Sequence, residues 1–430
     1  MKLQKIIFFS IGLTVIALTN FACVEQNPSL ASVSPDATAE NTINADAEVS
    51  AAQKEIEKMP NAAKGYNKLA VVYIRKARET GDFSLNSKAE TAVNRALEIE
   101  PKNLDAQRIK ASLLLTFHRF EEALNFGKQL QQAYPQDAIV YGVLTDANIE
   151  LGNYKEAIDA AQQMVNLRPN MESYARVSHV RSLHGDAEGA IEAMTLAARS
   201  ANPSDREAQA WCLTTLGDEY FKIGKYNEAE QEYEKALKIL PDYHYALAGK
   251  GNARAAKSDY EGAINFYTQA QKKVPLTETV IALGDVYTKI GKPEEAQKQY
   301  ELAEFIEQKL GDSSDRRRLA LLWADRDVKL DSALEIAGRE HEKRKDIYTA
   351  DIYAWTLYKK GQFQEAKAAI NEAMRLKTKD ARIFYHAGMI EKALGNKKEA
   401  TRFLQMALRT NPSFDILQAE KAKIALQELR

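Results

Sequence analysis

The chain has 430 residues, more than the ~100–200 residues usual for one domain, so it forms either several domains or an elongated repeat array. Its 59 Lys and Arg residues nearly balance its 60 Asp and Glu residues, which argues against a function driven by binding to nucleic acid or to an anionic membrane. Only 11 Pro and 20 Gly residues interrupt a composition rich in Ala, Leu, Glu, Lys and Gln, and this favours helices over strands.

The N-terminal segment, residues 1–22, has the composition of a signal peptide. Lys2 and Lys5 precede a short apolar run over residues 6–18, and a small residue, Ala22, stands at the expected cleavage point. The run is shorter than the ~20 apolar residues that a transmembrane helix needs. We therefore expect residues 1–22 to direct export and to be removed.

Cys23 follows that cleavage point, and this arrangement resembles the lipidation site of bacterial lipoproteins. The resemblance implies a lipid anchor on Cys23 and a location in the bacterial cell envelope, periplasmic or at the outer membrane. Asn20 and Phe21 stand where such signals usually carry an aliphatic and a small residue, so cleavage to a soluble secreted protein is the alternative. Residues 23–60 begin with a stretch rich in Ser, Ala, Asn, Thr, Asp and Pro, and we expect them to form a disordered tether because such a stretch buries too little apolar surface.

A regular period, roughly the ~34 residues of a helical repeat, runs through the rest of the chain. Pro101, Pro135, Pro169 and Pro203 are evenly spaced at this period. Alanines recur at nearly the same spacing, at Ala89, Ala123, Ala157, Ala190, Ala229, Ala263, Ala296, Ala333, Ala366 and Ala400. These positions predict about ten repeats.

The residues around these alanines resemble the tetratricopeptide repeat, a helix-turn-helix with the pattern W-x2-L-G-x2-Y, then A-x3-F, then P. The best match consists of Leu216-Gly217, Tyr220, Gly224, Tyr226, Ala229, Tyr233, Ala236 and Pro241. The resemblance covers residues 61–412 and implies an all-α fold, an α-solenoid coiled as a right-handed superhelix. Small residues are expected where helices approach closely, and the repeat-packing candidates are Gly217, Ala229, Gly251, Ala263, Gly284 and Ala296. Because only stacked repeats bury their apolar stripes, we expect one continuous apolar seam, an open curved face and no enclosed pocket.

The period also divides the chain into segments. Repeats one to seven cover residues 61–310, a degenerate repeat covers 311–346, repeats nine and ten cover 347–412, and residues 413–430 are predicted to form a C-terminal capping helix. The degenerate repeat carries two basic clusters, Arg316-Arg317-Arg318 and Lys343-Arg344-Lys345. We interpret them as a solvated helix face rather than as a binding patch.

The sequence contains no HExxH, CxxC or Walker pattern, and its six histidines are scattered over different repeats. We therefore expect no enzyme activity, no metal, no cofactor and no small-molecule substrate. The resemblance implies a scaffold for protein–protein interaction, in which the first helices of successive repeats line a concave groove for a peptide or a helix of a partner. The alternative is an accessory component of an envelope assembly or export machine (outer-membrane, pilus or polysaccharide) that binds a sugar or another solute.

The groove candidates on this pattern are Trp211, Asp218, Phe221, Tyr245, Asn252, Asp285 and Lys289. Trp211 and Tyr245 fall in one row and would supply aromatic anchors. Asp218, Asn252 and Asp285 fall in a second row and would fix a peptide backbone. The acids, together with Asp146, suggest a ligand that carries basic or hydroxyl groups.

Overall fold

The computed structural model describes residues 43–310 and 316–430, so the predicted signal peptide, Cys23 and the start of the predicted tether lie outside the described residues. Within these ranges the chain forms only helices and no strands. The helices are α2 (Ile43–Lys58), α3 (Ala63–Thr80), α4 (Ser84–Ile99), α5 (Leu104–Thr116), α6 (Phe120–Ala133), α7 (Ala138–Glu150), α8 (Tyr154–Leu167), α9 (Met171–Leu183), α10 (Ala187–Ser200), α11 (Arg206–Lys222), α12 (Tyr226–Ile239), α13 (His244–Ala256), α14 (Tyr260–Lys273), α15 (Thr277–Lys289), α16 (Pro293–Phe305), a π-helical turn (Ile306–Leu310), α17 (Arg317–Asp325), α18 (Leu330–Lys343), α19 (Ile347–Lys359), α20 (Phe363–Ala373), α21 (Ala381–Ala393), α22 (Lys397–Thr410) and α23 (Gln418–Glu428).

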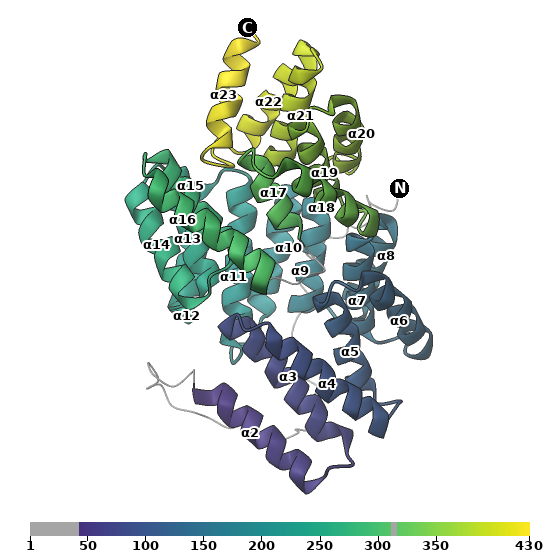
Figure 1. Cartoon of the computed structure of the whole chain (residues 1–430). Helices are drawn as coiled ribbons and strands as arrows, with labels where there is room; N and C mark the ends of the chain where they lie inside the picture. The colour runs from purple at the N-terminus through teal and green to yellow at the C-terminus, as the bar shows by residue number, and fades with distance from the viewer. Residues whose placement is uncertain (1–42, 311–315) are drawn as a thin grey trace, which may run out of the picture.

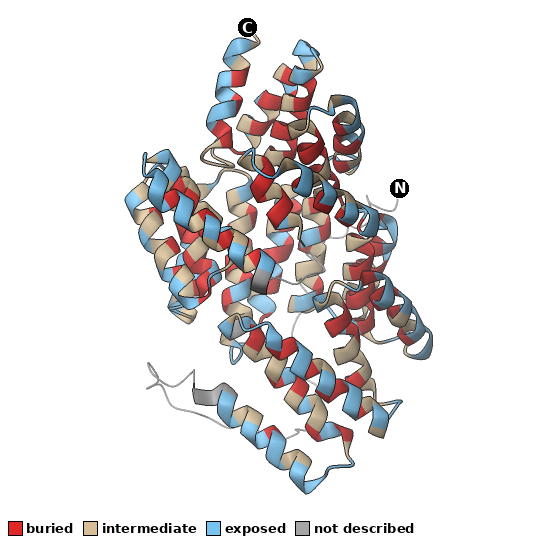
Figure 2. Ribbon diagram, in the orientation of Figure 1, coloured by how far each residue is buried: buried red, intermediate tan, exposed pale blue. Residues whose placement is uncertain are grey.

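Helices α3 to α22 form ten consecutive pairs, and each pair packs against the next (Figure 1). The predicted all-α solenoid of about ten repeats is thereby confirmed. In each pair the odd-numbered helix is the first and the even-numbered helix is the second. Buried residues lie mainly where helices face one another, and exposed residues lie on the outer surfaces (Figure 2). No helix in the two described ranges is both long enough and apolar enough to span a membrane.

The two helices of a repeat approach closely at glycine. A Cβ added to Gly217 would lie 2.5 Å from the ring of Tyr233, and one added to Gly284 would lie 2.8 Å from the ring of Tyr300. Each tyrosine belongs to the second helix of the same repeat, so a larger residue at the glycine would push the helices apart. Gly251 meets Tyr267 in the same way, at 2.5 Å. The predicted alanines share this packing and are buried: Ala229, Ala263 and Ala296.

Successive turns of the superhelix touch each other. Gly152 and Gly185, both at φ +74°, follow first helices and lie against loops that connect repeats in the C-terminal part of the chain. A Cβ on Gly152 would collide with the carbonyl oxygen of Lys345, and one on Gly185 would lie 2.6 Å from the carbonyl oxygen of Lys377. The chain therefore returns on itself, with contacts that join residues about 190 positions apart.

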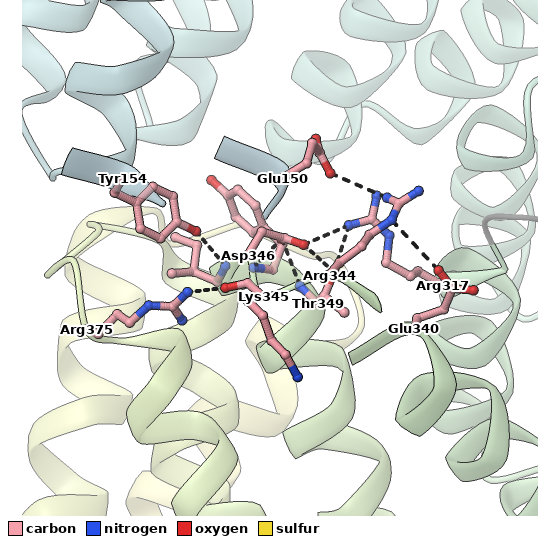
Figure 3. Close-up of polar contacts among 11 residues, drawn as sticks. Glu150, Tyr154, Arg317, Glu340, Arg344, Lys345, Asp346, Thr349 and Arg375 are labelled. Carbon is pink, nitrogen blue, oxygen red and sulfur yellow. Dashed lines mark hydrogen bonds and ion pairs between the residues drawn. The ribbon is translucent and has the colours of Figure 1, made fainter. Parts of the chain in front are cut away.

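Figure 3 shows the polar part of this contact between turns. Arg344 is only 2% exposed, and its guanidinium forms ion pairs with Glu150 on α7 at 3.5 Å and with Glu340 at 3.8 Å. The hydroxyl of Tyr154 accepts a hydrogen bond from the backbone N–H of Ile347 at 2.9 Å. The interpretation of this basic cluster as a solvated face is wrong for Arg344, because the earlier turn of the superhelix covers it.

Two terminal segments also differ from expectation. The predicted disordered tether over residues 23–60 does not hold for Ile43–Lys58, which form α2 and pack on α3. This stretch carries good helix formers, and stacking on the first repeat buries Ala52 completely. At the other end, α23 packs on α22 and α21 as a capping helix, but its buried face consists of Gln418 and three alanines, whereas Ile424 is 48% exposed.

Candidate functional site

A cavity of about 860 Å³, which we call the chamber, lies between the turns of the superhelix. Residues of α13, α15 and α17 line one side, and Arg382 of α21 and the C-terminal segment 413–424 line the other. The volume falls within the range of about 300–1,000 Å³ that is usual for ligand-binding pockets. The C-terminal segment crosses part of the concave face that a single turn would leave open, so the open face expected from the sequence is deepened here into a pocket that remains open to solvent.

Hydrogen bonds hold this C-terminal segment against the earlier turn. Asn411 Nδ2 donates to the carbonyl oxygen of Phe221 at 2.9 Å. The backbone N–H of Ser413 donates to the hydroxyl of Tyr226 at 3.0 Å, and Ser413 Oγ donates to the carbonyl oxygen of Ala256 at 3.2 Å. These bonds join positions far apart in the sequence, so tertiary contacts hold the wall of the chamber in place.

The chamber is lined by both large apolar side chains and charged side chains. Its large apolar side chains are Phe221, Ile281, Leu321, Leu322, Phe414, Ile416, Leu417 and Ile424. Four of the charged residues influence one another electrostatically, the carboxylates of Asp285, Asp325 and Asp415 and the guanidinium of Arg382, and we call these four the charged group. Such a mixture suits an amphipathic ligand, because apolar contact supplies binding energy and a few polar groups fix the orientation.

Each carboxylate of this group is held in place by neighbouring donors. Tyr300 donates its hydroxyl proton to Asp285 Oδ1 at 2.7 Å. Trp355 Nε1 and Gln418 Nε2 donate to Asp325 Oδ1 at 2.7 and 2.6 Å. The carboxylates are therefore oriented before any ligand arrives.

Asp415 has a structural role as well as a place in the charged group. Its Oδ1 accepts the backbone N–H groups of Leu417 and Gln418 at 2.9 and 2.8 Å, at the start of α23. Its Oδ2 lies 3.8 Å from Arg382. Asp415 thus links the capping helix to the only guanidinium of the group.

Burial and mutual repulsion disfavour the charged forms of these carboxylates. Burial, followed by the negative charge of Asp415, raises the pKa of Asp285 well above its ordinary range. Burial also raises the pKa of Asp325, and the charge of Asp415 adds to this effect while Arg382 opposes it. A cation placed among these carboxylates would stabilise their charged forms, because it offsets both the loss of hydration and the mutual repulsion.

The structure divides the predicted groove candidates into two sets. Phe221, Asn252, Asp285 and Lys289 line the chamber. Trp211, Asp218 and Tyr245 do not line it, although Trp211 and Tyr245 are each 38% exposed. Burial and then the carboxylate of Glu278, a residue of the chamber wall, raise the pKa of Tyr245.

The predicted polar row has a shared structural role. Tyr233 donates to Asp218 Oδ1, and Tyr267 donates to Asn252 Oδ1, both at 2.7 Å, just as Tyr300 does to Asp285. One oxygen of each residue in the row is therefore committed to a tyrosine of its own repeat.

The third predicted acid, Asp146, is neutralised within the protein. Its Oδ2 pairs with Arg176 at 2.6 Å, and its Oδ1 accepts a second bond from the same guanidinium at 3.0 Å. The prediction that Asp146 attracts a basic ligand is therefore not supported, because Arg176 already bonds both oxygens of the carboxylate.

Sequence reasoning missed Asp325, Asp415 and Arg382. Asp325 belongs to the degenerate repeat, Arg382 to the tenth repeat and Asp415 to the C-terminal segment. These parts are distant from the groove candidates in the sequence, so the order of repeats does not indicate that they meet. The repeat pattern could have indicated Arg382. It is the second residue of first helix α21, and the groove candidate Tyr245 holds the same position in first helix α13. The two carboxylates carry no comparable signal.

The remaining chemistry of the described residues is limited. Among residues 43–310 and 316–430, no group of three or more His, Cys, Asp and Glu residues is placed to hold a metal ion. The thiol of Cys212 is free and buried, and burial raises its pKa to about 12. The arrangement at the chamber can bind a ligand through ion pairs, hydrogen bonds and apolar contact.

Three family models match the chain, each described as a tetratricopeptide repeat, over residues 74–138, 210–243 and 352–380. The chain is 22% identical over 364 residues to "TPR repeat-containing protein MJ1428" of Methanocaldococcus jannaschii, covering 78% of this chain and 63% of that protein. It is 25% identical over 191 residues to human "Protein O-mannosyl-transferase TMTC1", covering 44% of this chain and 21% of that protein. The chain therefore spans less than two thirds of the length of these relatives. Among solved structures, "Human IFIT1 dimer with m7Gppp-AAAA" matches with a TM-score of 0.49 and 14% identity, over 86% of this chain and 87% of that one.

Proposed function

The chain is a tetratricopeptide-repeat protein, and from this premise we propose that it is a non-catalytic scaffold that binds a segment of another protein in the chamber. The observation that carries the proposal is the chamber itself, about 860 Å³ in volume, with apolar walls and oriented charged groups. First helices of four successive repeats contribute to it, so an extended segment could contact several repeats at once.

Exposed aromatic side chains support an extended binding face beyond the chamber. Trp211 and Tyr245 are large, stiff side chains on first helices, and each is more than one third exposed. Aromatic residues of this kind contribute strongly to protein interfaces because they bury much area at low cost in side-chain entropy. We assign to them the anchoring of the bound segment outside the chamber.

We place this scaffold in the bacterial cell envelope, tethered through a lipid on Cys23. The support is the sequence alone: a charged start, a short apolar run and a cysteine directly after a small residue. A tethered scaffold would hold its partner near a membrane and serve as an assembly platform. The alternative, an accessory subunit that binds a glycan or another solute, draws on the volume of the chamber, and it predicts that small glycans raise the melting temperature.

Site-specific photocrosslinking tests the scaffold. Phe221 lines the chamber, and Phe305 is 53% exposed on α16, a second helix, so the two positions form a matched pair of aromatic sites. A benzophenone side chain at each position, irradiated in the full-length protein in its native envelope, should yield defined crosslinked partners from position 221 and not from position 305. The same partners from both positions, or none from position 221, would reject the chamber as the binding site.

A further inference from the structure

We propose that the chamber recognises a cationic side chain, an arginine or a lysine of the bound segment, through Asp285, Asp325 and Gln418. This inference rests on the proposed function and specifies the chemistry of the occupant.

The carboxylates expose a surplus of hydrogen-bond acceptors to the chamber. Tyr300 uses only Oδ1 of Asp285, and both donors to Asp325 also converge on its Oδ1. Within the described part of the chain, no hydrogen bond reaches Oδ2 of either residue. A carboxylate has about four acceptor positions, so each of these groups retains the capacity for a strong donor.

Gln418 provides an independent observation that points the same way. Its side chain lines the chamber and is only 5% exposed. Its Nε2 donates to Asp325, and this fixes the orientation of the amide because an ionised carboxylate can only accept. Its Oε1 accepts no hydrogen bond from the described residues. Buried acceptors nearly always accept a hydrogen bond, so we expect a donor from a ligand to bind this oxygen beside Asp325.

The carboxylates of the charged group outnumber the cation that faces them. Arg382 faces the carboxylates, and its nearest acidic partner is Asp415 at 3.8 Å. Arg318, also in the wall, forms an ion pair with Glu278, and Arg326 lies 3.6 Å from the centroid of a tyrosine ring. Lys289 and Lys421 also line the chamber, and both are exposed to solvent. The two other acids of the wall, Asp327 and Glu420, pair with lysines outside the chamber. Within the charged group, three carboxylates therefore share the one guanidinium of Arg382.

An arginine or a lysine side chain fits both parts of this lining. Its charged head supplies only donors, and a guanidinium can reach two acceptors at once in a planar fork. Its aliphatic stem can lie along apolar surface while the head meets the acids, and Leu321 and Ile416 offer such a surface in the wall. A neutral residue would satisfy fewer acceptors, and an acidic residue would add a fourth negative charge.

A pair of peptides that differ only in charge tests the inference. The probes are acetyl-Ala-Leu-Arg-Leu-Ala-amide and the same peptide with citrulline, a neutral isostere of arginine, titrated into the full-length protein by calorimetry. Asp285→Asn removes one charge and keeps an acceptor for Tyr300. Asp331→Asn is the control, because this carboxylate is 92% exposed on α18, a second helix. The far-ultraviolet circular dichroism of both variants should match that of the parent.

The expected result is about tenfold tighter binding of the arginine peptide than of the citrulline peptide, a ratio typical of one charge-assisted hydrogen bond. Asp285→Asn should bring this ratio close to one, and Asp331→Asn should leave it intact. Equal affinities for the two peptides, an arginine preference that survives Asp285→Asn, or no binding of either peptide would overturn the inference. Crosslinked partners at position 221 would still support the scaffold in those cases, whereas their absence rejects the scaffold itself.

Discussion

Replacing Gly152 with alanine tests whether successive turns of the superhelix touch in solution. Gly152 has φ +74°, and a Cβ there would collide with the backbone of Lys345 in the next turn. Gly361 is a matched control, because it follows first helix α19 with φ +76° and a Cβ there would meet no atom of the described chain within 4 Å. The two variants share the same backbone strain, so their difference isolates the contact between turns.

The size of the difference follows from two contributions. The left-handed conformation costs a residue with a Cβ roughly 1–2 kcal/mol, and both variants lose this amount. Gly152→Ala must also displace the carbonyl group of Lys345, and overpacking of this kind costs about 1–3 kcal/mol. We therefore expect Gly361→Ala to lower the free energy of unfolding by about 1–2 kcal/mol and Gly152→Ala by about 2–5 kcal/mol.

Urea unfolding and hydrogen exchange measure the two effects. The unfolding midpoint should fall further for Gly152→Ala than for Gly361→Ala. The backbone amide of Ile347, which donates to Tyr154 across the turns, should exchange faster only in Gly152→Ala. Equal midpoints together with unchanged protection of Ile347 would show that these two turns are apart in solution.

Three further predictions follow from the buried charges and the N-terminal sequence. Arg344→Met should lower the free energy of unfolding by about 3 kcal/mol, because it removes the buried guanidinium that pairs with Glu150 and Glu340. Arg339→Met at an exposed site should change the free energy of unfolding by under about 0.5 kcal/mol, and equal urea midpoints for the two variants would contradict this reasoning. Burial raises the pKa of Asp218 to about 6, so the protonated form stabilises the fold below about pH 4 and this contribution is lost as the pH rises through 6. Asp218→Asn should therefore raise stability at pH 7.5, by up to about 2 kcal/mol, and leave it unchanged at pH 4, and a gain of equal size at both pH values would refute the assignment. Cys23→Ser should release the protein from membranes in a fractionation assay, and continued retention would count against lipidation.

The repeat packing could be predicted because it is local. Gly217 and Tyr233 belong to one helix-turn-helix and are close in the sequence, and the period of the sequence repeats the same pairing at Gly284 and Tyr300. Helix geometry fixes which residues meet over such a short span.

The location of the basic clusters illustrates the opposite case. Charged residues in a helix usually face water, and nothing near Arg344 in the sequence indicates otherwise. Its burial depends on Glu150 and Phe120, which lie in earlier repeats and reach it only because the superhelix returns over the loop after α18. The superhelix returns on itself because each repeat is rotated slightly relative to the one before. The motif residues specify the packing within a repeat but not the total rotation over many repeats.

The all-helical solenoid, the approximate number of repeats and a row of polar residues that includes Asp285 could all be read from the order of the amino acids. That Asp285 meets Asp325 and Asp415 in a chamber became visible in the folded chain. The first result depends on contacts within one repeat, which hydrophobic spacing and small residues specify directly. The second depends on rotations accumulated over several repeats, and these emerge only when the whole stack is assembled.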